Sequence, residues 1–183
     1  MGVVVEVSDE GVPQLRLPEP YNAAEYFVDR HIAEGRSNKA AIRTLDQEVS
    51  YAELADNVNR FGNALLSLGV RSGDRLLMVV KDCPEFFFLF WGAVKIGAMP
   101  IPLNGLAPAS DFEFIIQHSK CSALLYSREF ITTVEAALAA CSPKPKLVLG
   151  VEGDRESLSD LARNAPSHLD AIFTRAEDDC FSL

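Results

Sequence analysis

The middle of the chain alternates between two patterns of hydrophobic and polar residues. Short, continuous apolar runs at 76–80, 98–103, 123–126 and 146–149 are typical of strands buried on both faces. The stretches between them resemble helices, with apolar residues three and four positions apart. Because strands and helices alternate through short connections, the pattern predicts right-handed crossovers and a parallel sheet. We therefore expect a three-layer α/β fold.

The helix that precedes the first of these strands has the clearest boundaries. Ser50 and Glu53 have the spacing of a capping box, and Gly69 stands where a helix would end. One apolar stripe runs between them, formed by Leu54, Val58, Phe61, Leu65 and Leu68. Ser110 and Glu113 repeat the capping-box spacing and predict the start of a second helix, with Phe112, Ile115 and Ile116 turned inward.

The next two elements have unusual compositions. A helix predicted from Pro84 to Gly97 is apolar nearly all round, so we expect it to be buried against several partners. The strand at 98–103 contains Pro100 and Pro102, whose missing amide hydrogens lie on the same lateral edge. We therefore expect this strand at the edge of the sheet, or locally interrupted.

Two further elements are predicted ahead of this core. Asn22 is expected to cap a helix that ends at Gly35. The apolar face of this helix would consist of Ala24, Phe27, Val28 and Ile32. Residues 40–45 and 47–50 predict a hairpin around Asp46.

The two ends of the chain are predicted from composition. Residues 1–20 end in alternating prolines and predict a stiff lead-in, which leaves residues 21–183 as one α/β unit. After Gly150 the chain becomes polar, with a short helix near 158–162. The final AEDDCFSL places acidic residues before Phe181 and Leu183, and this pattern predicts a terminal buried strand.

Composition restricts the possible partners. The 183 residues are 48% hydrophobic and 23% charged, as in ordinary globular proteins, and the net charge is -9. This charge disfavours nonspecific binding to nucleic acid or to anionic membranes, although a helix terminus can still bind a small anion. No apolar run reaches membrane-spanning length, and the four cysteines lack the spacing of a disulfide framework or a zinc site. We expect a cytoplasmic protein.

A search for nucleotide-binding and nucleophile motifs finds no site. The sequence contains neither G-x-x-x-x-G-K-[ST] nor a G-x-G-x-x-G that follows a strand, and the two glycines at 92 and 97 belong to a predicted helix. Cys83 begins a helix but has no adjacent histidine. The stretch 118–121 (His-Ser-Lys-Cys) is better explained as a polar helix end than as a reactive cluster.

Other candidates have simpler structural explanations. His31 and His168 are expected on the surface without metal-ligand spacing. The acidic run 177–179 is more typical of a solvated lead-in than of a cation site, and the aromatic cluster 86–91 of a core than of a ligand cage. From the residues alone, we predict a soluble α/β domain that carries no active site of its own.

Three stretches, taken in order, resemble the adenylate-forming superfamily of acyl-CoA synthetases, peptide-synthetase adenylation domains and luciferases. They are 49–54 (VSYAEL), 68–75 (LGV followed by GDR) and 91–104 (WGAVKIGAMPIPLN). Within the superfamily, 21–24 (YNAA) and 103–106 (LNGL) are most similar to bacterial benzoate- and hydroxybenzoate-CoA ligases. The resemblance covers residues 21–183 and implies the N-terminal α/β subdomain of the large domain of such enzymes.

The resemblance implies a two-step reaction that uses ATP, Mg²⁺ and CoA. An aromatic carboxylate attacks the α-phosphate of ATP to form an acyl-adenylate and pyrophosphate, and the CoA thiol then displaces AMP. In the superfamily the phosphate loop, metal ligand, acid pocket and catalytic lysine lie downstream of Leu183, so no catalytic, cofactor-binding or metal-binding residue is assigned here. Some acyl-CoA ligases place a CoA-binding arginine just after the asparagine, where this chain has Gly105, Leu106 and Ala107.

We therefore expect the N-terminal fragment of an aryl-CoA ligase that ends before the phosphate loop and is inactive alone. Two alternatives are a stand-alone binding or regulatory module with the same fold, and an unrelated nucleotide- or flavin-binding α/β protein. Because the missing region would cover apolar surface, the fragment is also expected to self-associate.

Overall fold

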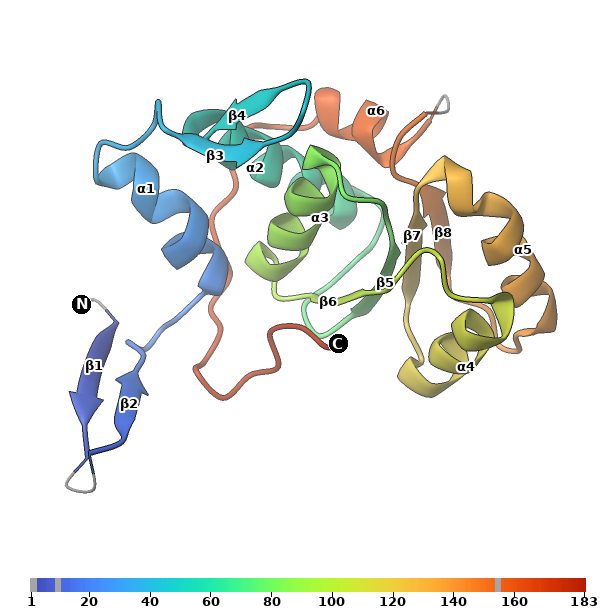
Figure 1. The fold of residues 1–183 in the computed structure, drawn as a ribbon, viewed down its shortest axis with the longest axis horizontal. Helices are drawn as coiled ribbons and strands as arrows, with labels where there is room; N and C mark the ends of the chain where they lie inside the picture. The colour runs from blue at the N-terminus through green and yellow to red at the C-terminus, as the bar shows by residue number, and fades with distance from the viewer. Residues whose placement is uncertain (1–2, 9–10, 154–155) are drawn as a thin grey trace.

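The computed structural model describes residues 3–8, 11–153 and 156–183, and its centre is a parallel four-stranded sheet in the order β6-β5-β7-β8 (Figure 1). The strands are β5 (Arg75–Val79), β6 (Met99–Pro102), β7 (Ala123–Tyr126) and β8 (Leu147–Gly150). The crossover helices are α3 (Pro84–Lys95), α4 (Ala109–Ser119) and α5 (Ile131–Ala140). The predicted α/β class with a parallel sheet is confirmed.

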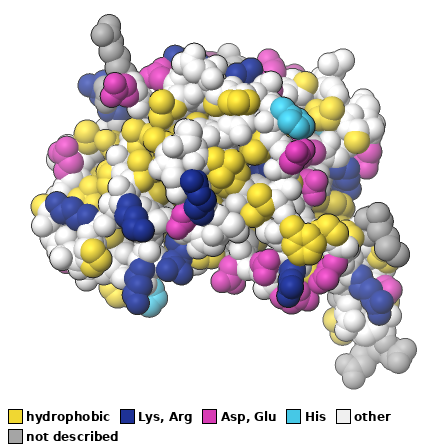
Figure 2. Space-filling view, turned by 180° about the vertical axis from the view of Figure 1, so that it is seen from behind, with side chains coloured by type: hydrophobic (Ala, Val, Ile, Leu, Met, Phe, Trp, Pro, Cys, Tyr) yellow, Lys and Arg dark blue, Asp and Glu magenta, His cyan; other side chains and the backbone are white. Residues whose placement is uncertain are grey.

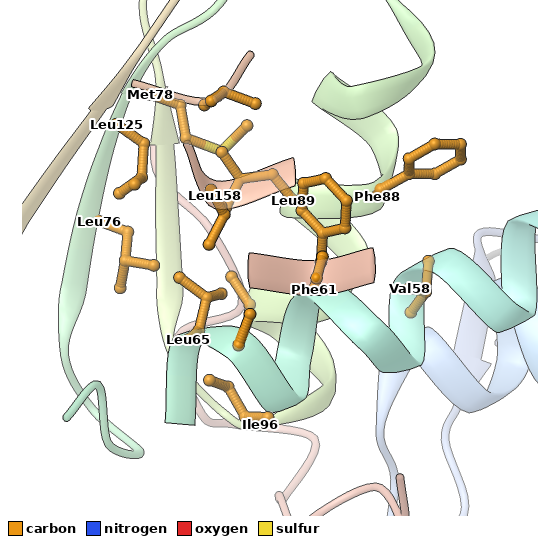
Figure 3. Packing of buried hydrophobic residues seen from close by; sticks show 14 of the residues in the cluster. Val58, Phe61, Leu65, Leu76, Met78, Phe88, Leu89, Ile96, Leu125 and Leu158 are labelled. Carbon is orange, nitrogen blue, oxygen red and sulfur yellow. The ribbon is translucent and has the colours of Figure 1, made fainter. Parts of the chain in front are cut away.

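Two hydrophobic clusters place helices on both faces of the sheet. Leu76, Met78 and Leu125 point to the face covered by α2 (Tyr51–Ser67), α3 and α6 (Leu158–Arg163), and Figure 3 shows their side chains interdigitating with Phe61, Leu65 and Leu89. The opposite face carries Leu77, Val79 and Leu124, which pack against α4 and α5. Helix, sheet and helix therefore form three layers.

Close contact between α2 and α3 depends on two glycines. A Cβ atom at Gly92 would lie 2.9 Å from the backbone nitrogen of Gly62 and 3.0 Å from the carbonyl oxygen of Val58. The two helix backbones therefore approach too closely for any larger residue at position 92. Of the two glycines noted in the sequence, Gly92 thus has a packing role between the helices, whereas Gly97 has a φ of +68° just beyond α3.

Strand β6 lies at the edge of the sheet, as its prolines predicted. Among the strands of the described residues it pairs with β5 alone, with Leu76 opposite Pro100 and Met78 opposite Pro102. The amides of Met99 and Leu103 donate inward, to the carbonyl oxygens of Asp74 and Met78. Because backbone groups alternate in direction along a strand, the two prolines face outward, and their lack of N–H leaves no inward hydrogen bond unmade.

The predicted hairpin at 40–50 is also present, as β3 (Ala40–Arg43) paired with β4 (Glu48–Ser50). Residues 1–20 were expected to be a stiff lead-in to the fold. Within them β1 (Val4–Val7) and β2 (Pro13–Arg16) form an exposed antiparallel hairpin that projects from the rest of the fold (Figure 1). A domain boundary at residue 20 stays a prediction.

The first helix was correctly located, but only half of its predicted apolar face is buried. Residues Glu25–Asp29 form a π-helical turn that continues into α1 (Arg30–Ala33). A π-helix has more residues per turn than the α-helical spacing assumed from the sequence. Consequently Ala24 and Val28 are buried, whereas Phe27 is 50% exposed and Ile32 38% exposed.

Of the two predicted capping boxes, only the first is formed. Ser50 Oγ accepts from the Glu53 amide at 3.2 Å, and Glu53 accepts from the Ser50 amide at 2.8 Å. The prediction at Ser110 was wrong, because α4 begins earlier, with Pro108 at its N-cap and no capping side chain. Ser110 lies inside the first turn and its hydroxyl contacts Asp111 instead.

The helix α3 was expected to be buried against several partners, and one side of it packs into the core while the other stays partly exposed. Phe88, Leu89 and Ala93 are buried, but Phe86, Phe90 and Trp91 are only half-buried and Phe87 is 39% exposed. We call these four half-buried or exposed rings the aromatic side of α3. Phe27 stacks on Trp91 with ring centroids 5.4 Å apart.

The terminal strand predicted from AEDDCFSL is absent as a regular strand. After α6, the chain crosses α2, where Arg60, Asn59 and Asn63 donate to backbone carbonyls between Ala165 and His168. It then reaches the outer edge of β6, where the Ser182 amide donates to the carbonyl oxygen of Pro100 at 3.2 Å. A full ladder cannot form there, because the prolines of β6 have no N–H to donate in return.

Candidate functional site

In parallel α/β sheets, ligands bind beyond the carboxyl ends of the strands, where the strand order reverses. Here the chain runs from β5 to β6 on one side and then returns to β7 on the other, so the reversal lies between β5 and β7. Lys81 follows β5 and Ser127 follows β7. The Lys81 amide donates to the Ser127 hydroxyl at 3.2 Å, and Ser127 is fully buried.

The Lys81 side chain joins three loops at this edge. Its Nζ lies 3.1 Å from a carboxylate oxygen of Glu129, after β7, and 3.3 Å from one of Glu152, after β8. The hydrogen bond to Glu129 raises the pKa of Lys81, and the Glu152 carboxylate acts in the same direction. Lys81 is therefore a cation that holds the loops together. Sequence reasoning missed it, although its place directly after a buried strand was the available signal.

Cys83 lies at the N-cap of α3, close to this edge. Burial raises the pKa of its thiol to about 12, and the backbone hydrogen bond from Phe86 opposes this shift only in part. A thiol with such a pKa is protonated at neutral pH and is a poor nucleophile. Cys83 therefore occupies the N-cap position of α3, without a capping hydrogen bond from its side chain, and is not an activated nucleophile.

The stretch 118–121 does not converge on one point. His118 is exposed and stacks on Phe114, with ring centroids 5.5 Å apart, whereas Cys121 is buried and its pKa is raised by that burial. Lys120 ends α4 in the left-handed conformation, with φ 50°, which turns the chain between them. These residues form a helix terminus.

The histidines differ in their exposure and in their contacts. His168 is exposed, with Nε2 3.4 Å from Asp170, as expected. His31 was expected on the surface but is half-buried: it stacks on Tyr51 at 3.9 Å and its Nδ1 accepts from Arg36 Nε at 2.8 Å. Burial lowers the pKa of His31. Across the ranges that the structure describes, no three His, Cys, Asp or Glu residues form a group that could hold a metal ion.

A pocket of 480 Å³ lies at the opposite, amino-terminal end of β5 and β6. Arg75 and Arg175 contribute positive charge to its wall, while Asp178 and Asp179 contribute negative charge. The Arg175 amide donates to Asp178 at 2.8 Å, so part of the acidic run caps its own turn. The mixed charge points to no single class of ligand.

Asn22 has a role that the sequence did not reveal. Its Oδ1 accepts from the Ala24 amide at 3.0 Å, as a cap does. Its Nδ2 also lies 3.2–3.3 Å from the carbonyl oxygens of Val94, Lys95 and Ile172. Asn22 therefore ties the first helix to the end of α3 and to the C-terminal segment.

No helix in the described part of the chain is long and apolar enough to cross a membrane. The profile of the family described as "AMP-binding enzyme" matches residues 29–180. The chain is 39% identical over 131 residues to a 4-hydroxybenzoate–CoA/benzoate–CoA ligase of Rhodopseudomonas palustris, which covers 72% of this chain and 24% of that protein. It is 33% identical over 172 residues to a benzoate–CoA ligase of Thauera aromatica, covering 93% and 33%.

A solved structure gives the same result in three dimensions. The structure of an anthranilate CoA ligase in complex with anthranoyl-AMP superimposes with a TM-score of 0.82 at 30% identity. The match covers 90% of this chain and 31% of that one. The chain thus spans between about a quarter and a third of the length of these proteins.

Proposed function

Because this chain belongs to the family of AMP-binding enzymes, we propose that it is the N-terminal part of an ATP-dependent aryl-CoA ligase. The observation that carries the proposal is the match of 93% of the chain to a benzoate–CoA ligase at 33% identity. The superposition on an anthranilate CoA ligase, whose substrate is also an aromatic acid, supports the same class. Membership of this family excludes the alternative that the chain is an unrelated nucleotide- or flavin-binding protein.

The proposed reaction joins an aromatic carboxylate to CoA. The carboxylate displaces pyrophosphate from ATP and becomes an acyl-adenylate, and the CoA thiol then displaces AMP to give the thioester. We assign no residue of this chain to ATP, Mg²⁺ or CoA, because its described residues offer neither a glycine-rich phosphate loop nor a group of metal ligands. The part that this chain plays is the three-layer scaffold.

We place the reaction in the cytoplasm, where ATP and CoA are both present. All four cysteines are free thiols, which suits a reducing compartment. The net charge of -9 supports a small-molecule substrate over nucleic acid.

The test uses the longer gene product that contains this chain. Purified protein is mixed with Mg-ATP, CoA and one acid at a time: benzoate, 4-hydroxybenzoate, anthranilate or a short aliphatic acid. We expect thioester, AMP and pyrophosphate in equal amounts with at least one aromatic acid. Formation of ADP, or turnover restricted to the aliphatic acid, would contradict the proposal.

A further inference from the structure

The hairpin β1–β2 has one apolar face, and that face is uncovered. In its register Val5 is the partner of Leu15, and Val7 is the partner of Pro13. Partners in adjacent strands share a face, so these side chains lie together on one side of the hairpin. Val5, Val7 and Leu15 are each 62–69% exposed. A hairpin of two strands is only marginally stable in water, and further strands that extend its apolar face stabilise it.

The outer edge of β1 presents backbone donors and acceptors. The Ser8 amide donates across the hairpin to the carbonyl oxygen of Val12 at 2.9 Å. Hydrogen-bonded and non-hydrogen-bonded pairs alternate along an antiparallel ladder, so the backbone groups of Val7 and Val5 face away from β2. Val3 is the next residue in this series. The N–H and C=O groups of these valines can therefore pair with another strand.

The outer edge of β2 is interrupted. Its outward-facing backbone groups belong to Pro13 and Leu15, the partners of Val7 and Val5. Pro13 has no N–H to donate, so a docked strand can pair completely with β1 but not with β2. Figure 1 shows β1 on the side of the hairpin that faces away from the rest of the fold. The body of the molecule therefore does not obstruct the edge that can pair.

A second copy of the chain matches the edge of β1. When two β1 strands run antiparallel about a twofold axis at Val5, Val5 lies opposite its own copy and Val3 lies opposite the partner's Val7. Each of these pairs exchanges both of its backbone hydrogen bonds. The facing side chains are all valines, which pack well across strands. On the other face Val4 lies opposite the partner's Glu6, so no two carboxylates are directly opposite.

Charge and closure both agree with this pairing. Glu6 already forms an ion pair with Arg16 of its own hairpin, at 2.8 Å. The two acidic bodies lie beyond the two β2 strands, on opposite sides of the combined sheet, and so remain apart. The outer edges of that sheet are the β2 strands, where Pro13 prevents further pairing. The geometry therefore gives a closed dimer and not a filament.

We propose that β1 is a dimerisation edge, on which the β1 strand of a second copy of this chain pairs antiparallel with the twofold axis at Val5. The combined sheet has one continuous apolar face. Because β1 has only four residues, the contact is small and the dimer is weak, so it forms as the concentration rises. This inference does not depend on the proposed ligase activity.

Two proline variants of the 183-residue chain test the edge. Val5→Pro removes an outward N–H from β1, and Leu15→Pro makes the same change directly opposite, on β2. Both remove an apolar side chain from the same face, and neither removes a hydrogen bond within the hairpin. Analytical ultracentrifugation should give a dissociation constant at least about tenfold higher for Val5→Pro, and within about twofold of the natural chain for Leu15→Pro. Equal effects, or a natural chain that stays monomeric up to about 500 µM, would overturn the proposal.

Cross-linking tests the register without relying on binding strength. Val5→Cys places a thiol opposite its own copy, at a Cα separation of about 5.5 Å that a disulfide can span. In Val7→Cys the two thiols are roughly 14 Å apart, because they lie four residues out of register. Under mild oxidation, peptide mass spectrometry should detect the intermolecular disulfide of Val5→Cys at least about tenfold faster than that of Val7→Cys. Equal rates would exclude the twofold axis at Val5.

The longer gene product distinguishes a second copy from other occupants of the edge. In hydrogen exchange followed by mass spectrometry, peptides that contain β1 should become more protected as the protein concentration rises. Protection that does not depend on concentration would mean that another part of the polypeptide covers β1, and the proposal would then be wrong. The measurement needs no substrate, so a longer protein without ligase activity would leave its result unchanged.

Discussion

Lys95 is the one charged side chain that is buried among residues 3–8, 11–153 and 156–183, with 3% exposure. Its ammonium lies 2.7 Å from a carboxylate oxygen of Asp29 and 2.7 Å from the amide oxygen of Asn59. These contacts connect the end of α3 to the π-helical turn and to α2. Because burying a charge is unfavourable, the buried ammonium is stable only while its hydrogen-bonding and ionic partners remain in place.

We therefore expect Asp29→Ala to lower the free energy of unfolding by about 3 kcal/mol, since it leaves the ammonium without its counter-charge. The control is Glu48→Ala, which breaks an exposed 2.8 Å ion pair with Arg43 and should cost less than about 1 kcal/mol. Chemical denaturation of both variants provides the comparison. Equal losses would show that Lys95 is not held by Asp29.

The raised pKa of Cys83 gives a second prediction at this scale. With a thiol pKa of about 12 against an ordinary value near 9, Cys83 at pH 8 should carry about a thousandfold less thiolate than in the unfolded chain. Alkylation by iodoacetamide, followed by peptide mass spectrometry in buffer and in guanidinium, should show a correspondingly large difference in rate. Similar rates in the two conditions would show that the fold does not raise the pKa of Cys83.

The raised pKa of Cys83 also sets the direction in which the stability of the protein changes with pH. A raised folded-state pKa means that the folded state keeps its proton where the unfolded state loses it. The contribution of Cys83 to stability is therefore complete below pH 9 and declines as the pH rises from about 9 toward 12.

At the scale of elements, the two capping-box patterns make a matched pair. Ser50→Ala should destabilise the protein by about 1 kcal/mol, because the Glu53 amide loses its acceptor. Ser110→Ala should change stability by less than about 0.5 kcal/mol, because Ser110 lies inside α4 and caps nothing. Thermal unfolding of the two variants decides between the sequence pattern and the structure; a larger loss at Ser110 would contradict the structure.

The Ser50 cap also has a pH signature. Hydrogen bonds from the backbone and the hydroxyl of Ser50 lower the pKa of Glu53. The resulting stabilisation is present above the ordinary pKa of a glutamate and is lost as the pH falls through the lowered value. The difference in stability between the natural chain and Ser50→Ala should therefore shrink in acid.

How well an element could be predicted depended on what fixes it. Local pattern fixed α2, the hairpin β3–β4 and the edge position of β6, and these predictions are confirmed. Long-range contacts fixed the rest. The π-helical turn is held by Asn22 and by the Lys95–Asp29 pair, and α4 begins at Pro108 despite the pattern at Ser110. The prediction of a terminal strand was wrong because the neighbouring strand, β6, has prolines at alternate positions.

The loops beyond the carboxyl ends of the strands show the same difference between local and long-range features. The sequence contains no familiar phosphate-loop motif. It also placed Cys83 at the start of a helix, and the structure confirms this position. It could not show that Lys81 lies between Glu129 and Glu152, because these three residues come from loops 23 to 71 positions apart in the chain and meet only when β5, β7 and β8 align. Only the order of the strands brings them together.

At the scale of the whole molecule, exposed apolar surface is the feature to explain. Figure 2 shows hydrophobic side chains gathered in a broad area on one face, and Phe27, Phe87 and Phe181 are each 39–50% exposed. The self-association expected from the sequence stays a prediction. Size-exclusion chromatography with light scattering, from about 5 to 500 µM, should show a mass that rises above 20.0 kDa with concentration. A constant 20.0 kDa species over that range would contradict it.

We propose that this chain supplies the scaffold of the ligase and that the chemistry lies in other residues of the polypeptide. The most direct measurement is pyrophosphate release with Mg-ATP, benzoate and CoA, by the 183-residue chain and by the longer gene product at equal concentration. We predict turnover by the longer protein and none above background by the 183-residue chain. Robust pyrophosphate release by the 183-residue chain alone would contradict the claim.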